Sequence, residues 1–307
     1  MVNFLMKAKA VMIGHAVGDA LGVPVEFRSR EYLDEHPVTD MTGYGTYPVP
    51  AGAWSDDTSM SLCALKSLAR DKNVIYFKDI MRNFRKWYDG GEFTPTGEMF
   101  DCGNTCSEAI VLGHGLDSEY SNGNGSLMRI HPFTLFLINS GVNKMSLTHL
   151  QTIGTASALT HAHTRSSAAC FIYSVILWEL LEKQNKECIA DALNGVKKFI
   201  AGFRECGELK TFDRLFNGIE KLDRNEIISD GYVVHTLEAA VWCLLTTDSY
   251  RECVLKAVNL GDDTDTTAAV AGGLAGALYG YGAIPEEWRN TLLKREYIED
   301  LCERAFK

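Results

Sequence analysis

Apolar side chains recur at intervals of three and four along most of the chain, which is the spacing of one face of an α-helix. The pattern predicts helices over these ranges: 4–22, 57–70, 75–88, 104–113, 146–160, 165–185, 187–204, 234–247, 249–258 and 264–279, with two short helices between 285 and 306. The sequence contains no set of alternating apolar and polar runs that would build a sheet. It therefore predicts an all-α fold that forms one compact domain over residues 1–307.

Small residues recur at every fourth position in the first of these helices and in the helix over 264–279. The residues are Gly14, Gly18 and Gly22, and Gly272, Gly276 and Gly280. Each set falls near one face of its helix, where glycine lets another helix approach closely. This costs about 1 kcal/mol of helix propensity for each glycine relative to alanine. We therefore expect the helix over 264–279 to be central and tightly surrounded.

The start of that helix is rich in carboxylates and hydroxyls. Its first polar residues are Asp262, Asp263, Thr264, Asp265, Thr266 and Thr267. Only one aspartate can cap a helix, and the others repel one another at short range. A hard divalent cation, which prefers oxygen ligands, would relieve this repulsion. The alternative is a solvated helix start with more aspartates than capping needs.

A second segment, Trp54-Ser-Asp-Asp-Thr58, repeats this chemistry far upstream, again in front of an apolar helical run. If the two helix starts converge, Asp56, Asp57, Asp263 and Asp265 supply four carboxylates, enough to offset the charge of two divalent ions. The two segments together predict a metal site in a cleft at the ends of these helices.

Composition narrows the classes of partner. The formal net charge of −10 argues against nucleic acid or an anionic membrane surface as a partner. It leaves room for an anionic ligand held by backbone amides and metal ions. The chain has nine cysteines at irregular spacing, and neither a secretion signal nor a bilayer-spanning apolar run is present. These features predict free thiols in a cytoplasmic protein, and the lack of an exposed apolar stripe predicts a monomer.

Four further features have both a functional and a plain structural interpretation. The glycine- and asparagine-rich run from Ser121 to Ser126 could wrap phosphates with its amides or form a simple turn. His161 and His163 lie between two predicted helices. Both could be metal ligands, or one of them could be a ligand contact or a helix cap. Glu26 and Asp101 are candidate acid–base residues, or else surface carboxylates or caps.

Five motifs occur in this order: Val17-Gly-Asp-Ala-Leu-Gly, followed by Val25-Glu-Phe; Trp54-Ser-Asp-Asp-Thr; Ser121-Asn-Gly-Asn-Gly-Ser-Leu-Met-Arg; Leu159-Thr-His-Ala-His; and Gly261-Asp-Asp-Thr-Asp-Thr. Together they resemble the ADP-ribosylglycohydrolase family over residues 11–280. The resemblance implies a compact all-helical domain with two Mg²⁺ or Mn²⁺ ions in a central cleft. The residues that match the family's metal ligands are Ser55, Asp56, Asp57, Asp263, Asp265 and Thr266.

The resemblance also implies roles for the remaining candidates. Glu26 matches a glutamate placed near the substrate ribose, and Asp101 is similar to an aspartate that transfers a proton in arginine-specific members. The residues that fall where the family holds ADP-ribose are Asn104, Ser121, Asn122, Gly123, Asn124, Gly125 and His161. Asp262 stands where the family often has glycine, and a supporting role behind the metal ligands is the one expectation for it.

The function implied is hydrolysis of the N-glycosidic bond between ADP-ribose and an arginine side chain, with a modified protein or a small ADP-ribose conjugate as substrate. Relatives that act on ADP-ribosyl-serine or O-acetyl-ADP-ribose are alternatives, but the segment Asp101-Cys-Gly-Asn-Thr105 favours arginine. A non-catalytic, crystallin-like relative is a further alternative, although the four crowded carboxylates argue against it. The last alternative is a dinuclear-metal phosphoesterase.

Overall fold

The computed structural model describes residues 2–307, and the regular elements in that range are helices. The α-helices are α1 Val2–Gly22, α2 Arg30–Glu35, α3 Asp56–Leu68, α4 Phe77–Gly90, α5 Asn104–Leu112, α6 His131–Asn139, α7 Leu147–Ser157, α8 Thr164–Lys183, α9 Cys188–Phe199, α10 Asp213–Phe216, α11 Val233–Leu245, α12 Tyr250–Val258, α13 Thr264–Tyr279, α14 Glu286–Thr291 and α15 Arg295–Phe306. Within this range, β-type pairing is limited to isolated bridges. The prediction of an all-α fold is confirmed.

Most predicted helices agree with the structure to within a few residues, and α13 has the predicted limits. Three α-helices are not among the predicted ranges: α2, α6 and α10. In α2, Ser29 caps the first turn by accepting a hydrogen bond from the Tyr32 amide at 3.3 Å. The segment 204–212 forms a 3₁₀-helix that leads into the four-residue helix α10. Elements of one or two turns are too short to show a helical period.

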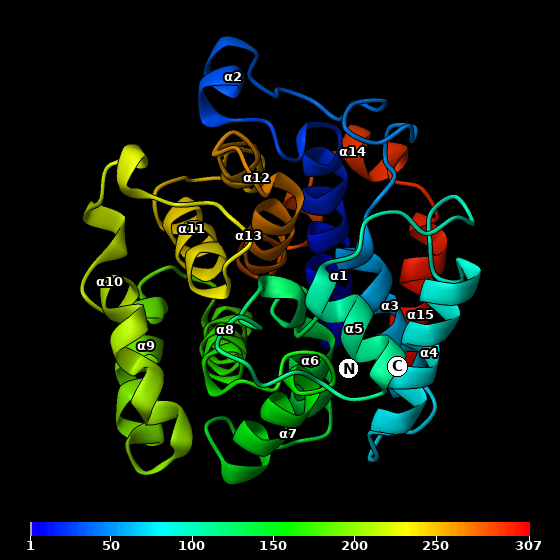
Figure 1. Cartoon of the computed structure of the whole chain (residues 1–307). Coiled ribbons are helices and arrows are strands. Elements are labelled where there is room, and N and C mark those ends of the chain that lie inside the picture. Colours follow the sequence, from blue (N-terminus) through cyan, green and yellow to red (C-terminus); the bar gives the residue numbers. More distant parts are fainter. Residues whose placement is uncertain (1) are drawn as a thin grey trace.

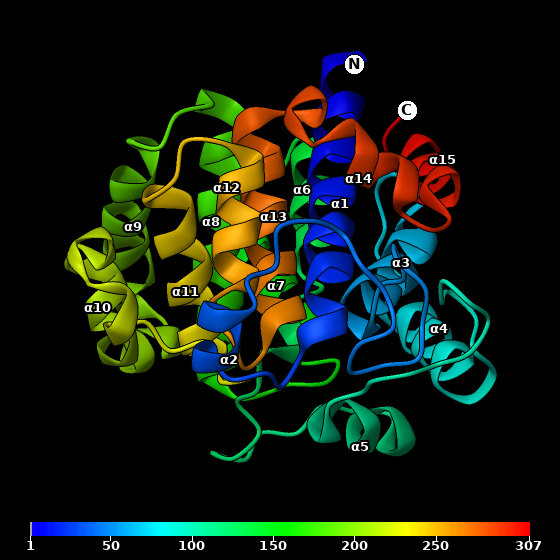
Figure 2. The ribbon, with the colours of Figure 1, turned by 90° about the horizontal axis from the view of Figure 1, so that it is seen from above.

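Helices α1 and α13 lie side by side in the middle of the molecule, with α8, α9 and α11 to one side and α3, α4 and α15 to the other (Figures 1 and 2). Their backbones touch. A Cβ atom at Gly18 would overlap the carbonyl oxygen of Ala268, and one at Gly276 would overlap that of Ala10. The predicted close packing is confirmed, except at Gly280, which follows the end of α13 with φ +83° and where an added Cβ would meet nothing within 4 Å.

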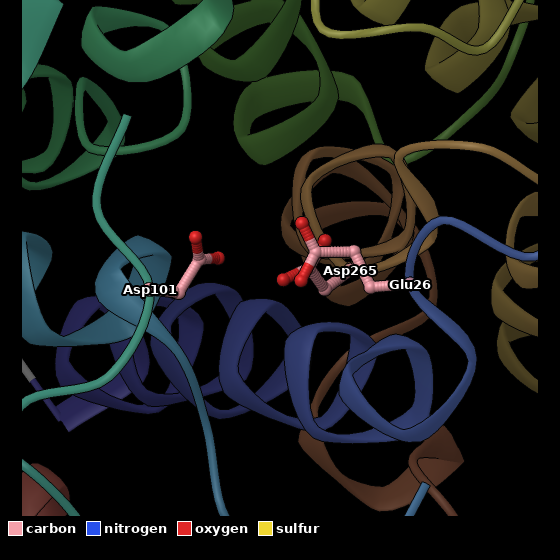
Figure 3. A group of neighbouring side chains, drawn as sticks. All are labelled: Glu26, Asp101 and Asp265. Atoms are coloured by element: carbon pink, nitrogen blue, oxygen red, sulfur yellow. The ribbon is translucent and has the colours of Figure 1, made fainter. Parts of the chain in front are cut away.

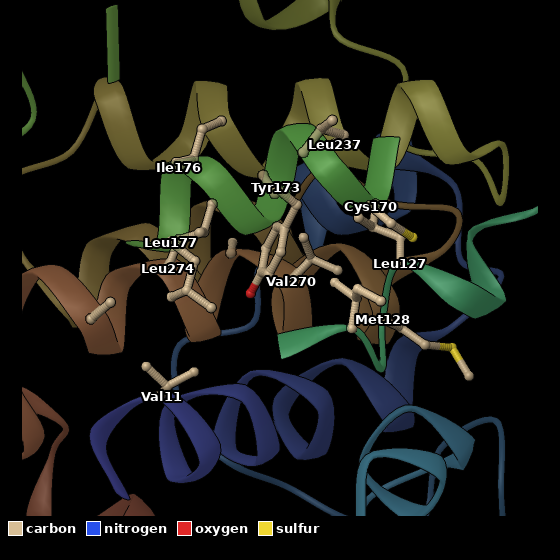
Figure 4. Packing of buried hydrophobic residues seen from close by; sticks show 14 of the residues in the cluster. Val11, Leu127, Met128, Cys170, Tyr173, Ile176, Leu177, Leu237, Val270 and Leu274 are labelled. Carbon is tan, nitrogen blue, oxygen red and sulfur yellow. The ribbon is translucent and has the colours of Figure 1, made fainter. Parts of the chain in front are cut away.

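The hydrophobic core continues from α13 to α8. Figure 4 shows Val270 and Leu274 of α13 facing Tyr173 and Leu177 of α8, with Val11 of α1 on the opposite side of α13. All five side chains are at most 1% exposed. Burying an aliphatic side chain stabilises the fold by about 1.5–3 kcal/mol. Helix α13 is apolar all round because it is packed on every side.

Helix α8 contains the longest apolar run of the sequence, which Glu179 interrupts. Glu179 is 6% exposed and forms ion pairs with Lys144 at 2.7 Å and Lys183 at 3.2 Å. Over the described range, no helix combines the length and apolar character that crossing a membrane requires.

Candidate active site

The two acidic helix starts meet at the C-terminal end of α1. Asp19, in the last turn but one of α1, accepts hydrogen bonds from the Ser55 amide at 2.8 Å and the Thr58 amide at 3.0 Å. Its carboxylate also accepts from the Thr58 hydroxyl at 2.6 Å. Gly22, at the end of α1, accepts a hydrogen bond from the Thr264 hydroxyl at 2.8 Å. One helix thereby positions the first turns of both α3 and α13.

Sequence reasoning gave Asp19 no role, although it lies in one of the motifs. The available signal was a carboxylate within an otherwise apolar helical pattern. Asp19 is fully buried, and this burial raises its pKa to about 6 against the opposing effect of its hydrogen bonds from Thr58 and Ser55. The Ser55 hydroxyl caps α3 by accepting from the Asp57 amide at 3.4 Å, and it donates its hydrogen to Asp57 Oδ2 at 3.1 Å.

The carboxylates of α3 and α13 share a buried space. Asp57 Oδ2 also accepts a hydrogen bond from the Thr266 hydroxyl at 3.3 Å, which links the two helix starts directly. Asp57 Oδ1 and Asp265 Oδ2 are buried, and neither has a hydrogen-bond partner among the described residues. Burial, followed by the charges of neighbouring carboxylates, raises the pKa of Asp57 and of Asp265 well above the usual range.

Capping does not account for these aspartates. Asp263 occupies the N-cap position of α13, yet its side chain makes no capping hydrogen bond and instead accepts from Asn124 Nδ2 at 2.7 Å. Asp265 Oδ1 accepts only from the adjacent Thr266 amide, at 2.9 Å. Buried carboxylate oxygens without donors, next to hydroxyls, form the kind of oxygen-only site that suits a hard divalent cation. The side chains present therefore fit such a cation.

Glu26 and Asp101 reach the same place from two loops. One carboxylate oxygen from each of Glu26, Asp101 and Asp265 lies within 4.8 Å of the others. Figure 3 shows Glu26 and Asp265 converging and Asp101 pointing toward them from the opposite side. The backbone is left-handed at Asp101 (φ +56°) and at Phe27 (φ +64°), so both loops turn sharply beside these carboxylates. This group joins both predicted acid–base residues to a predicted metal ligand.

The two carboxyl groups differ in acidity. Burial, reinforced by the charges of Asp101 and Asp263, raises the pKa of Glu26 to about 9. Burial, reinforced by Asp263, raises the pKa of Asp101 to about 6. The Tyr47 hydroxyl hydrogen-bonds with both groups and opposes the two shifts. Sequence analysis did not select Tyr47, because nothing in the long loop around it indicates which side chain turns inward.

A cleft with a volume of about 380 Å³ opens above the acidic residues. Its walls include these predicted site residues: Glu26, Asp56, Asp101, Asn104, Gly123, Asn124, Gly125, His161, Asp263 and Thr266. Ser55, Asp57 and Asp265 are buried beneath it. Two predicted substrate-binding residues lie elsewhere. Asn122 Oδ1 accepts a hydrogen bond from the Ser166 hydroxyl, and Asn122 Nδ2 donates to the Glu119 carbonyl oxygen, both at 3.0 Å. Ser121 lines a neighbouring cavity.

Two exposed aromatic residues at the cleft were absent from the predictions. Phe27 and Tyr120 line it with exposed fractions of 68% and 97%.

The additional acid, Asp262, is exposed, and its backbone pairs with the loop that carries Glu26. The Phe27 amide donates to Asp262 O at 2.7 Å, and the Asp262 amide donates to Arg28 O at 2.8 Å. Asp262 therefore joins that loop to the start of α13 through its main chain.

The two histidines have separate positions. His163 caps α8 by accepting a hydrogen bond from the Arg165 amide at 3.1 Å. His161 is 2% exposed and lines the cleft. His163 is therefore a helix cap, and His161 faces the cleft.

A protein-family model described as ADP-ribosylglycohydrolase matches residues 2–307. The chain belongs to the ADP-ribosylglycohydrolase family. ADP-ribosylarginine hydrolase Tri1 of Serratia proteamaculans is 36% identical, over 98% of this chain and 79% of its own length. ADP-ribosyl-[dinitrogen reductase] glycohydrolase of Rhodospirillum rubrum is 31% identical, over 93% of this chain and 90% of its own length. A solved structure described as an ADP-ribosylglycohydrolase-related protein complex has a TM-score of 0.80 and 30% identity, covering 100% of this chain and 99% of that chain. The family resemblance and the enzyme class, a hydrolase, are confirmed.

The acidic site of this ADP-ribosylglycohydrolase should make the metal-free protein less stable at high pH. Glu26 has a folded-state pKa of about 9 against an ordinary value of 4.5, so the folded chain holds this proton more tightly than the unfolded chain. The free energy of unfolding is therefore highest below the ordinary pKa and falls as the pH rises through the folded-state pKa. In EDTA, we expect Tm to fall between about pH 5 and about pH 9.

The Glu26→Gln variant should show a shallower fall, whereas Glu296→Gln, which removes an exposed carboxylate, should match the wild type. Excess Mg²⁺ should flatten the wild-type profile, because a bound cation replaces protons in neutralising the site. A metal-free protein that gains stability over this pH interval would contradict the expectation.

Proposed function

We propose that the protein is a metal-dependent hydrolase that cleaves the N-glycosidic bond of ADP-ribosylated arginine and releases ADP-ribose. The observation that carries the proposal is the convergence of two acidic helix starts with Glu26 and Asp101 at one cleft. The Serratia relative is named for the arginine linkage, and the Rhodospirillum relative for ADP-ribosylated dinitrogen reductase. An acidic cleft also suits the cationic guanidinium that leaves.

Two divalent cations, Mg²⁺ or Mn²⁺, would be held by Ser55, Asp56, Asp57, Asp263, Asp265 and Thr266. In support, the buried oxygens Asp57 Oδ1 and Asp265 Oδ2 have no hydrogen-bond donor in the described chain. The neighbouring hydroxyls and amides donate hydrogen bonds to the other carboxylate oxygens but carry no positive charge to balance the carboxylates. Cations bound there would supply Lewis acidity toward the ribose hydroxyls and a water molecule.

Proton transfer falls to Glu26 and Asp101. In the reaction, the bond from ribose C1″ to the guanidino nitrogen breaks and a water oxygen bonds to C1″. The nitrogen gains a proton and the water loses one. Asp101, with a pKa of about 6, titrates close to neutral pH and is suited to protonate the departing guanidine. Cations bound beside Glu26 would lower its pKa, and Glu26 then positions the ribose or accepts the proton of the water. General acid–base catalysis of this kind contributes about 10²–10⁴-fold.

The test measures release of free ADP-ribose from an ADP-ribosyl-arginine protein, with and without Mg²⁺ or Mn²⁺. We expect metal-dependent release that is lost in the double variant Asp56→Ala/Asp263→Ala and falls by at least about 10²-fold in Asp101→Asn. Asp262→Asn is the matched control, because Asp262 is an exposed neighbour of the site.

Other results would assign the cleft differently. Release from ADP-ribosyl-serine or O-acetyl-ADP-ribose, but not from ADP-ribosyl-arginine, would contradict the linkage while leaving the reaction class in place. Hydrolysis of a simple phosphate ester would favour a phosphoesterase. The absence of both ADP-ribose release and ADP-ribose binding would contradict the enzymatic proposal. Full activity in both Asp101→Asn and Glu26→Gln would remove these residues from the proton transfer.

A further inference from the structure

A buried arginine lies behind the wall of the cleft. Arg129 follows the glycine-rich loop and is fully buried, with its guanidinium 5.0 Å from the ring centroid of Phe84. It donates hydrogen bonds to the carbonyl oxygens of Ala156 at 3.0 Å and Ser157 at 3.5 Å, at the C-terminal end of α7. Its third acceptor is the Thr160 hydroxyl, at 2.7 Å. The guanidinium group is thus held by three uncharged oxygen acceptors, one of which is the Thr160 hydroxyl.

Thr160 connects Arg129 to His161, which lines the cleft. Its hydroxyl oxygen lies 2.9 Å from His161 Nδ1. A guanidinium group can only donate, so the hydroxyl accepts from Arg129, and its single hydrogen is left for His161 Nδ1 or for the Cys106 sulfur. Sulfur is the weaker acceptor of the two, and the Cys106 thiol is itself directed at the carbonyl oxygen of Gly125, to which it donates at 3.9 Å. His161 Nδ1 is therefore a hydrogen-bond acceptor.

The other ring nitrogen of His161 carries the proton. Burial, followed by the charge of Arg129, lowers the pKa of His161 to about 3, so the imidazole is neutral and has one N–H group. With Nδ1 accepting, that group is Nε2–H. Two glycines flank this edge of the ring. A Cβ atom at Gly123 would lie 3.5 Å from Nε2, and one at Gly125 would lie 3.0 Å from Cε1. No side chain from these two positions covers the donor.

We propose that Arg129 and Thr160 are positioning residues that hold His161 as its Nε2–H tautomer, so that His161 donates a hydrogen bond to the diphosphate of the substrate. The identity of this ligand rests on the proposed function. Carboxylates occupy the other side of the cleft and repel a diphosphate, whereas His161 is backed by a buried positive charge. A hydrogen bond supported in this way is stronger than one between isolated neutral groups.

The test uses the full chain labelled with ¹⁵N-histidine, with His161→Gln to assign the signal. Long-range ¹H–¹⁵N NMR reports which ring nitrogen is protonated, and calorimetry gives the Kd for ADP-ribose and for Mn²⁺. Wild type and Thr160→Ser should show Nε2–H. Thr160→Val, which lacks the hydroxyl at similar volume, should lose the fixed tautomer and bind ADP-ribose on the order of tenfold more weakly. Its Mn²⁺ affinity should be unchanged.

A wild-type protein with Nδ1–H would overturn the proposal, as would unchanged tautomer and ADP-ribose affinity in Thr160→Val. Thr160→Val that loses only thermal stability would make Thr160 merely structural. Thr160→Ala repeats the measurement without the bulk of valine. Failure of the wild type to bind ADP-ribose would contradict the proposed function and the diphosphate contact together, while NMR of the ligand-free protein still decides the tautomer.

Discussion

Replacing Asp265 by asparagine should abolish metal-dependent ADP-ribose release and also make the metal-free protein more stable. Asp265 is 1% exposed, and its Oδ2 is among the buried oxygens without a donor. Burial and the charges of Glu26 and Asp57 raise its pKa well above the usual range. An amide removes this repulsion, and its NH₂ group faces carboxylates that can accept. The Oδ1 atom remains to accept from the Thr266 amide.

The expected loss of activity exceeds about 100-fold, because outer-sphere partners of metal ligands alone cost 10–100-fold. The expected rise in Tm, in EDTA at neutral pH, is about 2 °C or more, the shift that 1 kcal/mol produces in a chain of this size. Release of ADP-ribose in Mn²⁺ measures the activity, calorimetric titration with Mn²⁺ measures the metal affinity, and thermal unfolding in EDTA measures Tm.

The control is Asp262→Asn, which makes the same chemical change at an adjacent, exposed position. It should alter neither Mn²⁺ affinity nor Tm appreciably. An Asp265→Asn protein that keeps metal-dependent activity would exclude Asp265 from the metal site. One that is less stable than the wild type in EDTA would mean that the crowded carboxylates are not a source of instability. The carboxylate that binds the metal would then also stabilise the fold, which is uncommon for a buried charge.

The sequence predicted helices best where several kinds of local signal coincided. Helix α13 begins at Thr264 and ends at Tyr279, as predicted, because a polar start, an apolar interior and regularly spaced glycines all fall within it. The segment 204–230 gave no such signal, since its 3₁₀-helices and the four-residue helix α10 are shorter than the window of about 11–18 residues in which a helical pattern is counted.

The site was predictable to the extent that its chemistry is written in contiguous residues. Two acidic segments and a glycine-rich loop stood out as motifs, and the structure brings their side chains to one cleft. Asp19 and Tyr47 did not stand out, because each acts through partners distant in sequence: Asp19 through Ser55 and Thr58, and Tyr47 through the carboxyls of Glu26 and Asp101. Roles of this kind depend on tertiary proximity, which spacing alone does not specify.

The contact between α1 and α13 supports the geometry of the site, since α1 holds both acidic helix starts. Gly18→Ala tests this directly. The added Cβ would overlap the carbonyl oxygen of Ala268, which belongs to the backbone of α13 and cannot rotate away. Alanine favours the helix by about 1 kcal/mol over glycine, but overpacking a core costs about 1–3 kcal/mol or more. We expect a net loss of stability of about 2 kcal/mol or more.

The same substitution should weaken Mn²⁺ binding, because separating α1 from α13 moves Asp19, which caps α3, away from the start of α13. Gly282→Ala is the matched control, since a Cβ at that position meets nothing within 4 Å. Thermal unfolding in EDTA and calorimetric titration with Mn²⁺ measure the two effects separately. A Gly18→Ala protein that gains stability would show that helix propensity outweighs the clash, so the backbones would not be in contact. Lost stability with unchanged Mn²⁺ affinity would mean that the metal ligands are positioned independently of the contact between these helices.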